Sequence, residues 1–100
     1  MRRLTIRIEV NLLGTLQEIA KKRNVSLEFD SFVAVKDVIS ELADFFPSKF
    51  RQVLIDPELN DPRPNVIILL NKKEIGLLAG LDTRIEDGDN LVLIPVSHGG

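Results

Sequence analysis

An apolar stripe near the middle of the chain constrains the fold more than any other feature. Its members recur at the spacing of one helix face, and they are Val35, Val38, Ile39, Leu42, Ala43 and Phe46. Pro47 follows the stripe and is expected to end the helix, because proline has no N–H to donate. Ala34 has no capping side chain, so the helix is expected to start nearer Ser31. A helix with one buried face needs a partner layer, and strand patterns on both sides of it in the sequence predict a sheet.

Four apolar patterns predict that sheet. Residues 4–10 and 25–29 alternate apolar and polar side chains, which indicates two strands with one buried face each, antiparallel to one another. Residues 66–70 are five consecutive apolar residues, so we expect a strand covered on both faces. Residues 91–94 form the last strand, which Pro95 is expected to stop. Because crossovers separate the first and last strands, these two are predicted to lie parallel at the sheet centre.

Shorter elements follow from local signals. Thr15 is a candidate N-cap with Glu18 as its capping-box partner, which predicts a helix to about residue 23. Residues 48–54 read as a further helical segment, and residues 55–65 carry three prolines among Asp and Asn, which indicates a surface loop. A turn is predicted at residues 71–73. It is expected to be longer than a tight hairpin, since Lys stands at the position that favours glycine in a type I′ turn.

Composition limits what the chain does. One hundred residues support a single domain. A net charge of −2 gives no electrostatic reason to expect nucleic-acid or membrane binding. No apolar run approaches the roughly 20 residues of a membrane span, and no signal-peptide pattern opens the chain, so we expect a cytoplasmic protein. The sequence has no cysteine and one histidine, which excludes disulfides, thiolate nucleophiles and multi-histidine metal sites.

Four smaller features have a structural and a functional interpretation. Residues 87–89, Asp-Gly-Asp, are expected to form a plain turn, because the full spacing of a calcium loop is missing. Residues 21–23 are basic and are expected to be a solvated helix face instead of a nucleic-acid site. His98 is interpreted as a recognition side chain or an exposed residue, not as a general base. Phe45 and Phe46 are adjacent, so one of them must point away from the buried stripe, toward a partner or beneath the following loop.

The last five residues are where we expect the chemistry. We expect a domain at residues 1–95 and a flexible tail at 96–100. No Cβ obstructs Gly99 or Gly100, so a narrow active site can accept them. Fully extended, the tail reaches about 16 Å beyond the domain. The residues expected to be recognised are Val96, Ser97, His98 and Gly99, and the reactive group is the carboxylate of Gly100.

The end of the chain also carries a family pattern. The run is Leu81-x-Thr83-x-Ile85-x-Asp87-Gly88-Asp89-x-Leu91, followed by Ile94-Pro95-Val96 and Gly99-Gly100. It resembles the sulfur-carrier branch of the ubiquitin-like β-grasp proteins, which includes the small subunit of molybdopterin synthase, the thiamine-pathway carrier, the ubiquitin-related modifiers and the small archaeal modifiers. The resemblance is specific over residues 66–100. It implies an α+β, ubiquitin-like β-grasp fold with a mixed sheet of about four to five strands packed on one main helix plus short helices.

The resemblance also implies a role as a substrate and not as an enzyme. A ubiquitin-activating-type enzyme would adenylate Gly100 using ATP and magnesium that this chain does not itself bind. A sulfur donor would then form a thiocarboxylate, or a lysine of a target protein would form an isopeptide bond.

Three readings stay open at this stage. The first is a sulfur carrier or protein modifier, which the ending at residues 98–100 favours. The second is the small, sulfur-donating subunit of molybdopterin synthase, with a large synthase subunit as partner; residues 11–14 lack the aromatic-rich segment common there. The third is a β-grasp protein-binding module without chemistry at its C-terminus.

Overall fold

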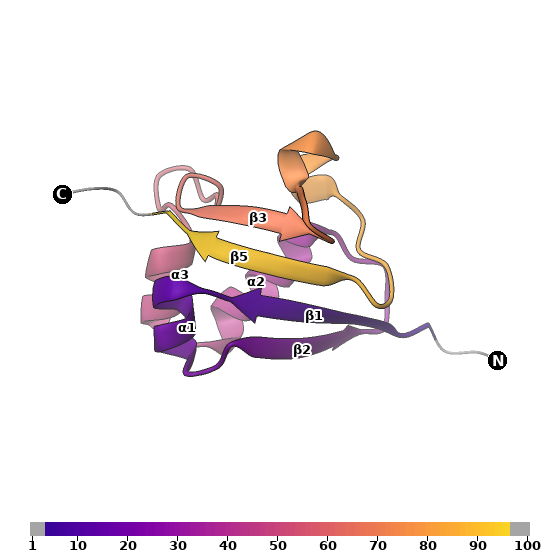
Figure 1. The fold of residues 1–100 in the computed structure, drawn as a ribbon, viewed down its shortest axis with the longest axis horizontal. Coiled ribbons are helices and arrows are strands. Elements are labelled where there is room, and N and C mark those ends of the chain that lie inside the picture. Colours follow the sequence, from indigo (N-terminus) through magenta and orange to yellow (C-terminus); the bar gives the residue numbers. More distant parts are fainter. Residues whose placement is uncertain (1–3, 97–100) are drawn as a thin grey trace.

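The computed structural model describes residues 4–96, in which three α-helices and two short 3-10 helices accompany five strands (Figure 1). The elements in chain order are β1 (Ile6–Leu12), α1 (Gly14–Ala20), β2 (Asn24–Phe29), α2 (Val35–Phe45), α3 (Ser48–Leu54), β3 (Val66–Leu70), β4 (Lys73–Glu74), η1 (Ile75–Leu77), η2 (Gly80–Asp82) and β5 (Asn90–Pro95). The predicted long helix, its short companion after Pro47 and the four main strands are all present.

The strands form one mixed sheet in the order β2-β1-β5-β3-β4. β1 and β5 lie parallel at its centre, and β2 and β3 pair antiparallel with them on either side. The predicted parallel centre and the α+β class are therefore confirmed. Figure 1 shows α2 lying behind the sheet, with α1 and α3 at the end toward which β1 and β5 run.

The core lies between the sheet and α2. The helix buries Val35, Val38, Ile39, Leu42 and Ala43, as its stripe predicts. Phe46 is partly buried and packs against Phe50 of α3, with ring centroids 4.7 Å apart. Phe45 is 61% exposed, so it is the member of the aromatic pair that points away from the core.

α2 begins at Val35 and not near Ser31. The Ala34 N–H donates to the Asp37 carboxylate at 2.8 Å, which supplies half of a capping box without any side chain at the N-cap. The Val35 N–H donates to the Thr83 carbonyl at 2.9 Å. These partners bind the N–H groups of Ala34 and Val35, and the Asp37 N–H, which a capping Ser or Thr would bind, donates instead to the Ala34 carbonyl at 3.0 Å.

α1 also differs from its prediction. It begins at Gly14, so the Thr15 N-cap and its capping box are wrong. The helix ends where Lys21 takes a left-handed φ of 59°, short of the predicted residue 23. The cause lies in the neighbouring hairpin, because the Leu12 N–H donates to the Arg23 carbonyl at 2.7 Å and draws that residue toward β1. Residues 21–23 are exposed, as predicted for a solvated face.

β3 is covered on one face only, which corrects the prediction of a doubly covered strand. Val66, Ile68 and Leu70 are buried, whereas Ile67 is 42% exposed. The helices pack on a single face of the sheet, so alternate residues of the strand face outward despite being apolar.

The turn from β3 to β4 is a tight, two-residue turn and not the longer one predicted. Asn71 and Lys72 take φ values of 49° and 73°, the positive values that a type I′ turn requires. The side chain of Asn71 accepts from the Asn90 N–H and donates to Asp89, both at 2.9 Å. These bonds fix the turn against β5, which offsets the strain of a lysine at positive φ.

Candidate functional site

The structure describes only the first residue of the predicted site, directly after β5. Of the tail residues, Val96 is described by the structure, whereas Ser97, His98, Gly99 and Gly100 lie outside the described residues. What the structure gives is the platform from which the tail departs, and this platform has three parts: the β5 end, the outer face of the sheet and the loop before β3.

Pairing with β3 continues past Pro95. Pro95 lies opposite Val66, and the Val96 N–H donates to the Asn65 carbonyl at 2.9 Å, which is the next position of the same register. In an antiparallel ladder, hydrogen-bonded pairs alternate with pairs that exchange no bond. Since the Asn65–Val96 pair is bonded, Pro95 occupies a position where its missing N–H costs nothing. The predicted stop at Pro95 is therefore wrong on the β3 side.

Pairing with β1 does end before Pro95. The last parallel register pair is Leu12 with Leu93, and the Leu13 N–H donates to the Leu93 carbonyl at 3.2 Å. After β1 the chain enters α1 at Gly14, where φ is 54°. A Cβ added to Gly14 would lie 3.6 Å from the Pro95 ring. Pro95 thus lies against the start of α1 while β3 still holds the next residue.

An apolar patch lies on the outer face of the sheet beside this exit. Ile67 faces Ile94, and Leu69 faces Val92, across the β3–β5 ladder. We call these four residues the outer patch. Ile67 is 42% exposed, and its three companions are partly exposed. A partly exposed apolar surface beside the end of β5 suits contact with a protein partner.

The outer patch was missed at the level of sequence, although a signal for it exists. The chain contains only one long apolar helix stripe, at residues 35–46, and one such helix covers one face of a sheet. A strand of five apolar residues in such a chain must expose its alternate side chains. The run at residues 66–70 therefore indicates an outward-facing apolar surface as well as a core strand.

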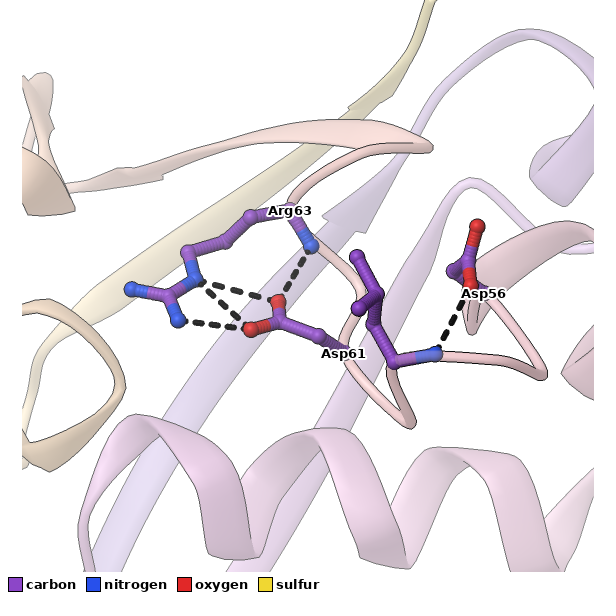
Figure 2. Close-up of polar contacts among 4 residues, drawn as sticks. Asp56, Asp61 and Arg63 are labelled. Atoms are coloured by element: carbon purple, nitrogen blue, oxygen red, sulfur yellow. Dashed lines mark hydrogen bonds and ion pairs between the residues drawn. The ribbon is translucent and has the colours of Figure 1, made fainter.

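The loop between α3 and β3 is held by its own carboxylates (Figure 2). Asp61 accepts from Arg63 Nε at 3.0 Å, from Nη2 at 2.6 Å and from the Arg63 backbone N–H at 2.8 Å. Asp56 accepts from the N–H groups of Glu58 and Leu59, both at 2.9 Å. The hydrogen bonds from Arg63 hold the pKa of Asp61 below its usual value, and the same contact raises the pKa of Arg63. The predicted surface loop is confirmed, but it is an ordered one.

Other charged side chains described by the structure make contacts within the fold. Lys36 of α2 donates to Asp82 at 2.9 Å, and this hydrogen bond raises the pKa of Lys36. Residues 87–89 form the predicted turn, in which Gly88 has a φ of 89° and Asp87 accepts from the Arg7 N–H at 2.9 Å. Within residues 4–96, no three His, Cys, Asp or Glu side chains gather as a metal site would require.

Comparison with known proteins identifies the family. A sequence model of the family described as Urm1 (Ubiquitin related modifier) matches residues 7–100, which spans β1 through the end of the tail. The chain belongs to the ubiquitin-related modifier family.

Relatives of this family member span almost its whole length. It is 24% identical to the ubiquitin-related modifier 1 homolog of Caenorhabditis elegans, over 96% of this chain and 98% of that protein. It is 26% identical to small archaeal modifier protein 3 of Haloferax volcanii, over 93% and 98% of the two chains. The solution structure of small archaeal modifier protein 1 from Methanosarcina acetivorans matches with a TM-score of 0.79 and 26% identity, covering 97% and 99%.

These matches decide between the interpretations left open by the sequence. The ubiquitin-like β-grasp fold is confirmed by the structural match, and the family match confirms the reading as a ubiquitin-like sulfur carrier and protein modifier. The readings as a synthase subunit and as a module without C-terminal chemistry gain no support. None of the helices in residues 4–96 has the length and apolar character to cross a membrane.

Proposed function

We propose that the carboxylate of Gly100 is the reactive group of this ubiquitin-related modifier and that a ubiquitin-activating-type enzyme adenylates it. Family membership makes the chain a sulfur carrier and modifier, which is a substrate and not a catalyst. The observation that carries the proposal is that β3 holds the chain as far as Val96, and that the Gly99-Gly100 ending follows within four residues in the sequence.

The proposed chemistry follows from the weakness of a carboxylate as an electrophile. Its oxygen attacks the α-phosphorus of ATP, pyrophosphate leaves, and the acyl-adenylate gains AMP as a leaving group. A donor of sulfide-level sulfur then attacks the acyl carbon and expels AMP to give a thiocarboxylate, or a lysine of a target protein attacks the same carbon and expels AMP to give an isopeptide bond. The activating enzyme supplies the ATP, the magnesium and the positioning. We propose a cytoplasmic location for this reaction, in keeping with the lack of a signal-peptide pattern at the start of the sequence.

We further propose that the activating enzyme binds the outer patch. A partner that draws the tail into its active site must contact the surface beside the point where the tail departs. The patch is apolar, and its neighbours on the same face of the sheet are polar or charged: Asn11 of β1 lies beside Val92, and Glu74 of β4 lies opposite Leu69. An apolar area with a polar rim is the composition that protein partners recognise.

The tail completes the arrangement. Residues 97–100 reach about 13 Å beyond Val96 at about 3.3 Å per residue, which is enough to enter an active site. In this proposal Ser97 and His98 are recognised by their side chains. Gly99 and Gly100 pass the narrowest part of the site because they have no Cβ.

The test uses the activating enzymes of the source organism with Mg-ATP and the full chain. Mass spectrometry is expected to find an adenylate on Gly100, which a sulfur donor converts to a thiocarboxylate. Deleting Gly100 moves the carboxylate by about 3.3 Å, and Gly99→Val adds a branched Cβ to the tail. Both variants are expected to melt like the parent but to lose activation about a hundredfold, since misplacement of about 1 Å has that effect.

Two results would contradict the proposal. An unchanged mass of the parent with every activating enzyme would remove the carrier function. Adenylation of both variants at the parent's rate would show that the tail does not thread a narrow site.

A further inference from the structure

We propose that Asn65 is a positioning residue that sets where the reactive tail begins. The inference rests on the proposed function, because it concerns how Gly100 reaches an activating enzyme. It goes beyond that function by assigning control of the tail to a residue in a loop far from the tail in sequence.

Asn65 holds three separate parts of the molecule through its three polar groups. Its backbone N–H donates to the Pro62 carbonyl at 2.9 Å, which ties it to the preceding loop. Its side-chain Nδ2 donates to the Val53 carbonyl of α3 at 3.1 Å in a partly buried position. Its carbonyl accepts the Val96 N–H at 2.9 Å. Asn65 therefore joins the loop, a helix and the first residue of the tail.

The loop before Asn65 is itself fixed. Asp56 and Asp61 form an isolated antiparallel bridge in which the Asp56 N–H donates to the Asp61 carbonyl at 3.0 Å. The Asp61 side chain, 18% exposed, binds the Arg63 guanidinium through two nitrogens, as Figure 2 shows. Pro62 lies between these two residues and is buried. Since the Pro62 carbonyl also accepts the Val66 N–H at 3.0 Å, the position of Asn65 is set from both sides.

This arrangement controls the reach of the tail and not the stability of the sheet. The preceding bonded position of the same alternation is Ile67 with Ile94, so the β3–β5 ladder persists as far as Ile94 without the Asn65–Val96 bond. With the bond made, four residues lie beyond the last fixed amide. Without it, the last amide held by β3 is that of Ile94, Pro95 and Val96 are no longer held by β3, and the carboxylate samples a larger volume. Because catalysis depends on placement to about 1 Å, this freedom lowers the rate of adenylation.

Two substitutions weaken the hydrogen bond between Asn65 and Val96 by independent routes. Val96→Pro removes the N–H that donates to Asn65, and its control is Val96→Ile, which keeps the N–H and a β-branched side chain. Asn65→Ala removes the side-chain bond to Val53 and so loosens the hold on the Asn65 backbone carbonyl, while the backbone bonds to Pro62 remain. Each variant is made in the full chain, and its melting temperature is measured first.

The readouts separate positioning from folding. ATP–pyrophosphate exchange by the activating enzyme gives kcat and KM for each variant. For Val96→Pro and Asn65→Ala, kcat is expected to fall about tenfold, because the outer patch still docks while the carboxylate is misplaced. KM is expected to stay within about twofold. Amide hydrogen exchange at Val96 is expected to be protected in the parent and at least about tenfold faster in Asn65→Ala.

The outcomes test the role of Asn65 separately from the proposed adenylation of Gly100. A parental kcat for Val96→Pro with an unchanged melt would overturn the proposal. So would unchanged Val96 exchange together with parental kcat in Asn65→Ala, and this second variant decides the matter if Val96→Pro fails to fold. Absence of adenylation in the parent would reject the proposed function itself, while Val96 exchange in Asn65→Ala would still show whether Asn65 holds the tail.

Discussion

Ile67 of β3 lies directly opposite Ile94 of β5 on the outer face, while the next pair along the ladder, Ile68 with Leu93, points into the core. Two adjacent isoleucines on one strand thus have different surroundings. One is 42% exposed and the other 1% exposed. Substituting them separately distinguishes docking from folding.

Ile67→Asp is expected to fold but to bind the activating enzyme poorly. It removes one apolar cross-strand contact, which costs about 1 kcal/mol, and it places a charge in the outer patch. We expect a rise of at least about tenfold in the KM for adenylation, corresponding to about 1.4 kcal/mol of lost binding. Pyrophosphate exchange measures this, with Ile67→Leu as the control. Unchanged KM in the Asp variant would show that docking occurs elsewhere.

Ile68→Asp is expected to prevent folding. An unpaired carboxylate at this buried position costs several kcal/mol, a large share of a typical stability of about 5–15 kcal/mol. Circular dichroism is expected to show an unfolded or insoluble chain. A melting curve like that of the parent would mean that the inner face of β3 is wrongly assigned.

Asp61→Asn tests the carboxylate that orders the loop before β3. Hydrogen bonding from Arg63 lowers the pKa of Asp61 in the folded protein, below the unfolded value of about 3.9. Its contribution to stability is therefore present above about pH 4 and is lost as the pH falls through the folded pKa. We expect the Asn variant to be less stable than the parent at neutral pH.

The pH dependence supplies the control for that variant. Urea unfolding of both proteins is compared at pH 7 and near pH 3, where the difference in unfolding free energy is expected to shrink as Asp61 becomes protonated. A difference that stays the same at both pH values would show that the ionised carboxylate does not stabilise the loop.

Lys72→Gly is expected to stabilise the protein. Lys72 has a φ of 73° in the turn between β3 and β4, where a Cβ costs about 1–2 kcal/mol and glycine's extra freedom in the unfolded chain costs about 0.5–1 kcal/mol. We expect a net gain of about 0.5 kcal/mol from these two terms, measured by urea unfolding. The matched control is Lys73→Gly, which lies in β4 and is expected to destabilise. Equal effects at both positions would contradict the type I′ assignment.

The helix α2 and the strands β1 and β2 were predictable because periodicity directly reports which face of an element is buried, and β5 was predictable from the apolar run at residues 91–94 before Pro95. The boundaries of these elements were less predictable, because partners distant in sequence set them. Val35 starts α2 because Thr83 accepts its N–H, and Lys72 tolerates a tight turn because Asn71 binds β5. Neither partner is near in sequence, so local propensity alone points to a different start and a longer turn.

The candidate site was predictable only in part. The Gly99-Gly100 ending is visible in the sequence, and so is the family pattern before it. The role of Asn65 is not, because it depends on Val53 and Val96 approaching from α3 and β5. The outer patch was obscured for a different reason: a run of apolar residues does not state whether one or both faces of its strand are covered.

The parallel alignment of β1 with β5 also determines how this protein can be handled. β1 starts at the end of the sheet opposite to the one where β5 finishes (Figure 1). A purification tag, fluorophore or surface linker attached ahead of β1 is therefore separated from the point where the tail departs by the length of the sheet. Antiparallel first and last strands would bring such an attachment next to the end of β5. Immobilisation through the N-terminal end of the chain thus leaves the tail accessible for capturing activating enzymes.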